Sequence, residues 1–179
     1  RPSENYIGLF GYASVVDIQN VHLRDVDVLG GSSVGGLIGR DLTTLGTLTG
    51  CSVTGTVEAA TTSVGGLGGS LAATGVSYSW SDCEVIGNDD YVGGFLGNAG
   101  SSGGSLSNCT SYGTVEGGSN MVIGGFVGYN SGDIFDTESY CAVSGQSTMG
   151  GFVGQSQGTI TRCQSFGDVS GNYLLGSFA

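Results

Sequence analysis

The sequence contains no lysine and only one histidine among its 179 residues. Without lysine, the chain lacks both the usual P-loop phosphate ligand and the amine that Schiff-base chemistry requires. Fifteen acidic residues against four arginines give a net charge of −11, which disfavours binding to nucleic acid. The single His22 cannot supply a zinc motif of the His-Glu-x-x-His type, which needs two histidines. Several classes of enzyme and of nucleic-acid-binding protein are therefore excluded or disfavoured.

Proline and long apolar runs are also scarce. One proline and 37 glycines without a Gly-X-Y period exclude a collagen helix, and 39% hydrophobic residues argue against simple disorder. Glycine at this density also disfavours long helices. No apolar run approaches the roughly 18 residues that span a bilayer, and no signal-peptide pattern is present. We therefore expect a mature or excised piece with no membrane insertion.

The glycines belong to a repeated signature, a hydrophobic residue followed by Gly-Gly, then Leu or Phe, any residue and usually Gly. The five strong copies span residues 34–39, 64–69, 92–97, 123–128 and 149–154. A degenerate copy lies at 7–11 and a truncated one at 175–179. Successive copies are 26 to 31 residues apart, so six periods fill the chain.

A second block follows each signature, with an aliphatic residue and then a valine nine positions later, as in Ile160 and Val169. The first copy, from Ile18 to Val28, has one extra residue. Side chains alternate along a strand and the offset of nine is odd, so the aliphatic residue and the valine cannot both point inward from one uninterrupted strand. A bend is therefore expected within each block. It is expected at a position that three coils fill with glycine, namely Gly55, Gly113 and Gly167.

Periods of this length with short β-branched runs and no helical periodicity are typical of β-solenoids, in which each repeat forms one coil. The sequence predicts an all-β, single-stranded β-solenoid (β-helix) of about six coils of 26–31 residues, forming a single domain over residues 1–179. The residue after each double glycine is expected to point inward. From Leu9 onward, this core ladder comprises Leu37, Leu67, Phe95, Phe126, Phe152 and Phe178.

The signature, together with a following block such as residues 106–117 (LSNCTSYGTVEG), resembles the GLUG motif family. The opening residues 6–11 (YIGLFG) resemble it too, and the likeness covers essentially the whole chain. GLUG repeats occur in arrays within large secreted or surface-attached microbial proteins, including adhesin-like proteins and non-catalytic parts of immunoglobulin A-specific metallopeptidases. The resemblance implies a β-solenoid stalk or binding module and supplies no catalytic residues.

The five cysteines fall into two columns of the repeat. Cys51, Cys109 and Cys163 share one column, and Cys83 and Cys141 share another. Within a column the nearest cysteines are two coils apart, roughly 10 Å, whereas a disulfide needs Cα atoms about 4.4 to 6.8 Å apart. We expect five free, buried thiols that act as small apolar fillers, with a disulfide or a metal or redox role as the alternatives. No CxxC spacing indicates zinc.

Two acidic clusters are candidates for incidental calcium binding: Asp89 with Asp90, and Asp133 with Asp136. Solvated loop acids are the simpler interpretation, and no other cofactor is expected. A glycosidase-like pair of acids would be supported by an acidic residue that recurs at one position of the repeat, but no such column repeats consistently. We therefore expect no enzymatic activity.

Trp80, Tyr78 and Tyr91 are candidates for a sugar-stacking patch near the third coil. The alternative is that Trp80 covers an end or side of the core, and His22 is expected to be an ordinary surface residue. The outward columns mix Thr with Asp, Glu and Ala, which breaks the threonine ladder of an ice-binding solenoid.

The expected function is that of a non-catalytic structural and adhesive module of an extracellular or cell-surface microbial protein. A carbohydrate-binding solenoid module is the alternative. The expected partners are further solenoid repeats or other copies of the chain stacked end to end into a filament, because neither end shows a capping helix. A glycan or host surface is a further expected partner. The near-integral number of repeats fits either an excised segment of a longer array or a filament subunit.

Overall fold

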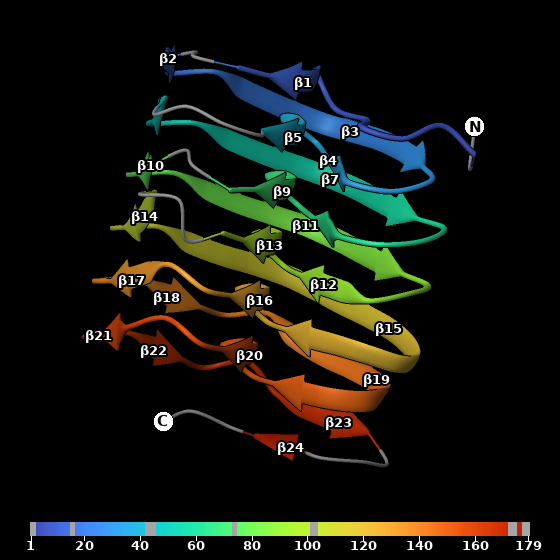
Figure 1. The fold of residues 1–179 in the computed structure, drawn as a ribbon. Helices are drawn as coiled ribbons and strands as arrows, with labels where there is room; N and C mark the ends of the chain where they lie inside the picture. The colour runs from blue at the N-terminus through green and yellow to red at the C-terminus, as the bar shows by residue number, and fades with distance from the viewer. Residues whose placement is uncertain are drawn as a thin grey trace.

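The computed structural model describes residues 3–14, 17–41, 46–72, 75–100, 104–171 and 175–176. Regular structure in these ranges consists of 24 β-strands, and the strands pair in parallel. The strands stack coil upon coil along one axis, with β1 to β3 at one end and β21 to β24 at the other (Figure 1). The prediction of an all-β solenoid is confirmed.

Each turn of the chain contributes strands to three sheets, which we call A, B and C. Sheet B contains β1 (Phe10–Ala13), β5 (Ile38–Asp41), β9 (Gly68–Leu71), β13 (Leu96–Ala99), β16 (Val127–Asn130) and β20 (Val153–Ser156). Sheet C contains β2 (Asp17–Gln19), β6 (Thr47–Thr49), β10 (Gly75–Ser77), β14 (Ser105–Ser107), β17 (Asp133–Phe135) and β21 (Ile160–Thr161). Six strands in a sheet are separated by five turns, so the solenoid has about five turns, slightly fewer than the predicted six.

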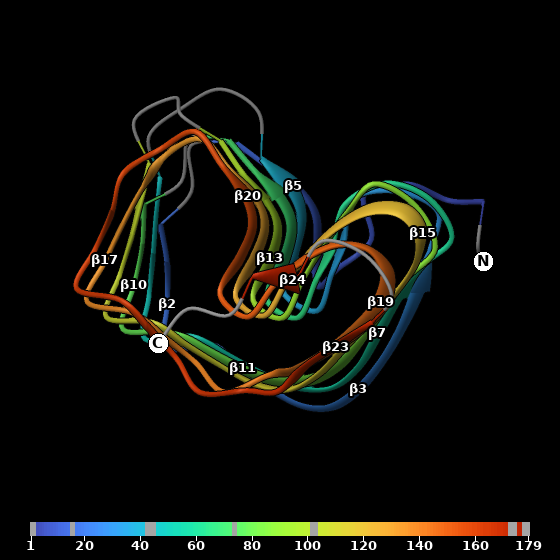
Figure 2. The same ribbon diagram turned by 90° about the horizontal axis from the view of Figure 1, so that it is seen from below.

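Sheet A contains twelve strands of two kinds. The strands that lead away from the corner with sheet C are β3 (His22–Gly30), β7 (Ser52–Ala59), β11 (Trp80–Gly87), β15 (Thr110–Gly124), β18 (Glu138–Ser139), β19 (Ala142–Gly150), β22 (Gln164–Ser165) and β23 (Val169–Gly171). Its short return strands are β4 (Val34–Gly35), β8 (Val64–Gly65), β12 (Tyr91–Gly93) and β24 (Leu175–Gly176). Seen along the axis, sheets B and C face each other, while sheet A runs beneath them and folds back through the continuous strands β15 and β19 (Figure 2).

The bend between sheets C and A lies earlier than predicted. It occurs two residues after each aliphatic residue, where the backbone adopts a positive φ of 50° to 65°. This corner column contains Asn20, Gly50, Tyr78, Asn108, Asp136 and Arg162. A single left-handed residue reverses the inside–outside alternation, which accounts for the odd offset. The predicted bend at Gly55 and Gly113 is wrong, because both lie within strands, β7 and β15. Gly167 does lie at a break, between β22 and β23.

The signature glycines are required by close packing. A Cβ on Gly94 would lie 2.3 Å from the carbonyl oxygen of Gly125 and 2.6 Å from Cys141 Sγ. Opposite these glycines, the Ser81 and Ser111 hydroxyls of sheet A donate hydrogen bonds to the carbonyls of Gly94 and Gly125, at 2.8 and 2.9 Å. Among the described residues, the glycines with positive φ are Gly50, Gly55 and Gly113. The signature glycines therefore serve close backbone approach rather than a left-handed conformation.

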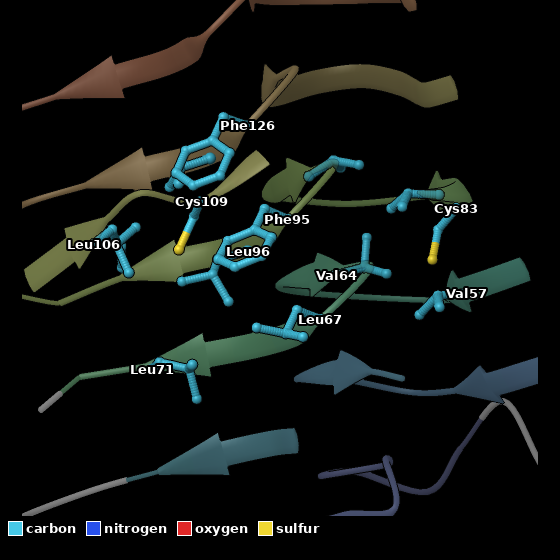
Figure 3. Close-up of a cluster of buried hydrophobic side chains, with 14 of the residues drawn as sticks. Val57, Val64, Leu67, Leu71, Cys83, Phe95, Leu96, Leu106, Cys109 and Phe126 are labelled. Atoms are coloured by element: carbon cyan, nitrogen blue, oxygen red, sulfur yellow. The ribbon is translucent and has the colours of Figure 1, made fainter. Parts of the chain in front are cut away.

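The core contains the predicted ladder over most of its length. Leu37, Leu67, Phe95, Phe126 and Phe152 are all buried, and side chains of successive coils point into the same interior (Figure 3). The rings of Phe95 and Phe126 stack at 4.7 Å between centroids, and those of Phe126 and Phe152 at 5.3 Å. Leu9 departs from the expectation: it precedes the first complete coil, and its side chain is 57% exposed. Phe178 lies outside the described residues.

We expect Gly94→Ala to lower the free energy of unfolding by about 3 kcal/mol or more, because backbone atoms of the next coil must move to admit a methyl group. Gly75→Ala is the matched control, since the nearest atom to its added Cβ is 4.0 Å away. Its stability should stay within about 0.5 kcal/mol of the original protein. Denaturant melts followed by circular dichroism measure both changes, and equal stabilities of the two variants would contradict close packing at Gly94.

Candidate functional site: the outer face of sheet A

The outer face of sheet A presents aligned columns of side chains. In β11, Ser81, Cys83 and Val85 point inward, while Trp80, Asp82 and Glu84 point outward. The parallel register then places equivalent residues of successive coils beside one another. One outward column contains His22, Ser52, Trp80, Thr110, Glu138 and Gln164. The face is therefore a regular array set by the backbone.

Three exposed aromatic rings stack in the neighbouring column, and we call Tyr112, Tyr140 and Phe166 the aromatic ladder. The centroids of Tyr112 and Tyr140 are 5.1 Å apart, and those of Tyr140 and Phe166 are 4.8 Å apart, with interplanar angles of 12° and 15°. The exposed fractions are 40%, 39% and 56% in chain order. Each ring therefore contacts its neighbour and still offers an apolar edge or face to solvent.

A carboxylate orients the central ring of this ladder. The Tyr140 hydroxyl donates a hydrogen bond of 2.9 Å to Glu138 Oε2. This hydrogen bond raises the pKa of the Tyr140 hydroxyl, because loss of the proton would place a negative charge beside Glu138. Tyr140 is thus held as a neutral donor on the surface.

Trp80 stands between two hollows of this face. The large hollow, about 530 Å³, is lined by His22, Leu23, Arg24, Asp25, Ser52, Thr54 and Trp80. The small hollow, about 330 Å³, is lined by Trp80, Asp82, Thr110 and Tyr112. The large hollow exists because Ser52 and Thr54 of β7 are short and lie between longer side chains of β3 and β11. Trp80 therefore forms a wall shared by both hollows.

The three aromatic residues predicted as a sugar-stacking patch are placed differently. Trp80 lines both hollows. Tyr78 lies at the corner between sheets C and A, is 66% exposed and lines neither hollow. Tyr91 lies on the return strand β12 and packs against Tyr129, with centroids 5.1 Å apart. Only Trp80 of the three therefore belongs to the described hollows.

Sequence reasoning missed the aromatic ladder and the residues around Trp80. The ladder had a readable signal, since it fills one column of the repeat in three consecutive coils. The small hollow depends on which residues flank Trp80 in the next coil, Thr110 and Tyr112, and this requires the register. His22 was expected to be an ordinary surface residue; its Nδ1 lies 2.8 Å from Ser52 Oγ within the large hollow.

The outer face of sheet A is strongly acidic. Its outward positions carry eight of the fifteen acidic residues, namely Asp25, Asp27, Glu58, Asp82, Glu84, Glu116, Glu138 and Asp168. Arg24 is the arginine on the same face. The summed charge repels polyanions and favours neutral or cationic ligands.

All five cysteines are buried and free. Cys51, Cys109 and Cys163 follow the corner column and donate to nearby carbonyls, as Cys109 Sγ does to Ser107 O at 3.1 Å. Cys83 and Cys141 point inward from sheet A, with Gly113 in the coil between them. Burial raises the pKa of Cys83 and Cys109 to about 12 and of Cys141 to about 11. These thiols are therefore protonated and unreactive near neutral pH.

The two acidic clusters make local contacts. Arg162 donates to both oxygens of the Asp136 carboxylate, at 2.6 and 2.7 Å, and this pairing lowers the pKa of Asp136. Asp89 Oδ1 accepts a hydrogen bond of 3.0 Å from the backbone N–H of Asp90. Within the described ranges, no group of three or more His, Cys, Asp or Glu residues is arranged to hold a metal ion.

No family model, curated protein or solved structure matches this chain. Across the described residues there is no helix long and apolar enough to cross a bilayer. The chemical properties of the site therefore rest on its own geometry: a rigid acidic sheet face with stacked aromatic rings and two hollows.

We expect five reactive thiols after denaturation without a reducing agent and very slow labelling of the native protein near pH 8. Fewer than four thiols in the denatured sample would contradict the free-thiol assignment. Titration with a chromogenic disulfide reagent measures both states.

The raised thiol pKa values also predict a pH dependence of stability. Because the thiol pKa is higher in the folded than in the unfolded protein, the protonated thiols stabilise the fold. This stabilisation is complete below the pKa of an unfolded cysteine, about 8.5, and is lost as the pH rises toward the folded pKa values of about 11 to 12. The free energy of unfolding should therefore fall between pH 9 and 11.5. In Cys109→Ala the free energy of unfolding should fall less steeply with pH than in the original protein. Chemical denaturation at a series of pH values measures this, and the same pH dependence in both proteins would contradict the raised pKa of Cys109.

Proposed function

We propose that this chain is a non-catalytic structural and adhesive module of a secreted or cell-surface microbial protein. The observation that carries the proposal is the aromatic ladder, an ordered row of exposed rings on a sheet whose interior strands are hydrogen-bonded on both sides. Contiguous exposed apolar groups on a soluble protein mark interaction sites. The resemblance of the glycine signature to GLUG repeats supports the same function and an extracellular or cell-surface location.

The ladder suits adhesion because its geometry is set before any partner arrives. The backbone of each strand is held by parallel pairing, and the rings are further held by contact with one another. Binding therefore costs little side-chain entropy, which favours weak contacts repeated along a surface. A flat row of rings also fits a flat partner such as a glycan or a host surface layer.

End-to-end association is part of the proposed structural function. In the described part of the chain, β1, β2 and β3 occupy one end of their sheets, and β20, β21 and β22 to β24 occupy the other. Each end offers strand edges that a further repeat or a second copy can extend by parallel pairing. The partners in this proposal are further solenoid repeats or copies of this chain.

A second candidate function is carbohydrate binding, favoured by the position of Trp80 between two hollows lined by hydroxyl and carboxylate groups. An indole face packs against the C–H face of a sugar ring, while the polar lining can hydrogen-bond its hydroxyls. This candidate is compatible with adhesion, because a glycan is one surface that the module can bind.

The adhesive proposal predicts that the aromatic ladder carries surface binding. The triple variant Tyr112→Ser, Tyr140→Ser, Phe166→Ser should lose at least about tenfold in affinity, since one ring contact of about 1.4 kcal/mol corresponds to tenfold. Depletion from solution onto insoluble cellulose, chitin, β-glucan and mucin-coated beads measures the affinity. Tyr12→Ser is the matched control, because Tyr12 is an exposed tyrosine on sheet B. Absence of binding to every surface, or equal binding of triple variant and control, would refute the proposal.

End-to-end association predicts a mass that rises with concentration. Light scattering after size-exclusion chromatography, from about 5 µM to about 500 µM, should show species that are multiples of 17.9 kDa, because open strand edges pair by mass action. A monomer at all concentrations would remove self-association from the proposed function and leave adhesion unaffected.

A further inference from the structure

We infer that the large hollow binds a neutral sugar unit of a glycan, with Trp80 as the stacking platform and Arg24 and Asp25 as the polar ligands. This inference rests on carbohydrate binding, the second candidate function above. The inference starts from one coincidence. The hollow lies where the first block, from Ile18 to Val28, has one extra residue, and the other five blocks have no such insertion.

The insertion is absorbed by a β-bulge that places two polar residues at the hollow. The register between β3 and β7 shifts between Leu23 and Val26, and Asp25 adopts a φ of 52°. The Asp25 N–H is held by Thr54 Oγ1 at 3.1 Å, so the bulge is anchored to the floor of the hollow. Bulges redirect side chains and are common beside functional sites.

The side chains around the hollow offer hydrogen-bonding groups of both kinds. Within the described residues, neither the Arg24 guanidinium nor the Asp25 carboxylate forms a side-chain hydrogen bond or an ion pair. Arg24 supplies donors only and Asp25 supplies acceptors only, while the hydroxyls of the floor can do both. A sugar hydroxyl also donates and accepts, so a polyhydroxylated ring can satisfy this mixed set.

The shape fits one sugar unit against an aromatic wall. The volume of about 530 Å³ lies within the range of roughly 300 to 1,000 Å³ that is usual for small-ligand sites. Trp80 is 39% exposed, so its indole keeps an accessible surface for a ligand. Opposite it, the β3 wall combines the apolar Leu23 with the polar side chains of His22, Arg24 and Asp25.

The charge of the surrounding face selects against acidic sugars. Asp27, Asp82 and Glu84 lie on the same face near the hollow, and Arg24 is the arginine among them. A sulfated, sialylated or uronic acid unit would meet net repulsion. A cationic peptide would be attracted by the acids, but Arg24 would repel it at the hollow itself. The hydroxyls of a neutral glycan can hydrogen-bond both the Arg24 guanidinium and the Asp25 carboxylate, and a neutral glycan brings no charge that this face or Arg24 would repel.

The ligand can extend beyond one unit. Past Trp80 lie the small hollow and then the aromatic ladder, all on the outer face of sheet A. Neutral oligosaccharides should therefore bind more tightly as they lengthen, until they reach the end of the ladder at Phe166.

Fluorescence tests the inference directly, because Trp80 is the only tryptophan in the chain. The probes are hexamers of β-1,4-glucose, β-1,3-glucose, β-1,4-mannose and β-1,4-N-acetylglucosamine, with hexagalacturonate and hexa-arginine for comparison. At least one neutral hexamer should change the emission saturably. Arg24→Ala and Asp25→Asn should each raise its Kd at least tenfold at an unchanged melting temperature; Asn tolerates the left-handed backbone at this position.

The control is Tyr78→Asn, which removes an exposed aromatic residue two positions from Trp80 and outside both hollows. Asparagine already occupies the same corner in Asn20 and Asn108, so the fold is retained and the Kd should not change. Trp80→Ala, followed by calorimetry, should abolish binding of the neutral hexamer.

Three results would overturn the inference: no response to any neutral hexamer at millimolar concentration, an unchanged Kd in Arg24→Ala and Asp25→Asn, or binding of only the acidic or the arginine hexamer. The adhesive proposal fails separately, through the triple ladder variant. Loss of adhesion in that variant together with no Trp80 response would retain the adhesive module and reject the sugar site.

Discussion

Parallel backbone hydrogen bonds join each interior strand to the equivalent strands of the coils on either side, and the rest of the structure depends on this pairing. A residue that widens a paired segment would displace its neighbours, so differences in coil length are confined to loops and to bulged stretches such as the one between Glu116 and Val122 of β15. The signature glycines show the constraint most clearly. At Gly94 the next coil and a cysteine of sheet A leave no room for a methyl group. The glycine content therefore reflects tight contact in a rigid stack.

The same pairing organises the outer face of sheet A. Because equivalent residues lie one coil apart, an aromatic residue repeated at one position must stack, even where solvent surrounds it. Tyr112, Tyr140 and Phe166 do so with nearly parallel rings. Departures from the repeat have equally local effects: the extra residue of the first coil is confined to a bulge at Asp25, and β3 regains its register by Val26. The outer face of sheet A can thus be changed coil by coil on an unchanged scaffold.

Much of the fold could be predicted from the sequence because the repeat is explicit. The spacing of the signatures predicts the solenoid, and the residue after each double glycine predicts the core ladder from Leu37 to Phe152. The odd offset in each block correctly requires a bend, but assigning it to glycine led to the wrong position. Bulky residues such as Tyr78 and Arg162 adopt the left-handed corner, and the Tyr78 N–H is held there by a hydrogen bond of 3.2 Å to Ser107 O of the adjacent coil. Propensity alone does not contain that information.

The candidate site was less accessible to sequence reasoning. Its columns depend on which residues face outward, and the misplaced bend left that alternation uncertain. The large hollow depends further on side-chain size in three neighbouring coils, with short Ser52 and Thr54 between β3 and Trp80. Tyr91 lies close to Trp80 in sequence, yet the chain turns back between them and places Tyr91 beside Tyr129.

The corner column between sheets C and A has a consequence for how such a module can diversify. Its six members, from Asn20 to Arg162, share a backbone conformation but include amide, aromatic, acidic and basic side chains and glycine. The corner thus accepts side chains of every charge type that are not branched at Cβ, while its backbone positions recur at one-coil intervals along an edge of sheet A. It forms a row of variable positions beside the proposed binding face, where substitutions can change surface charge and side-chain size without altering the core.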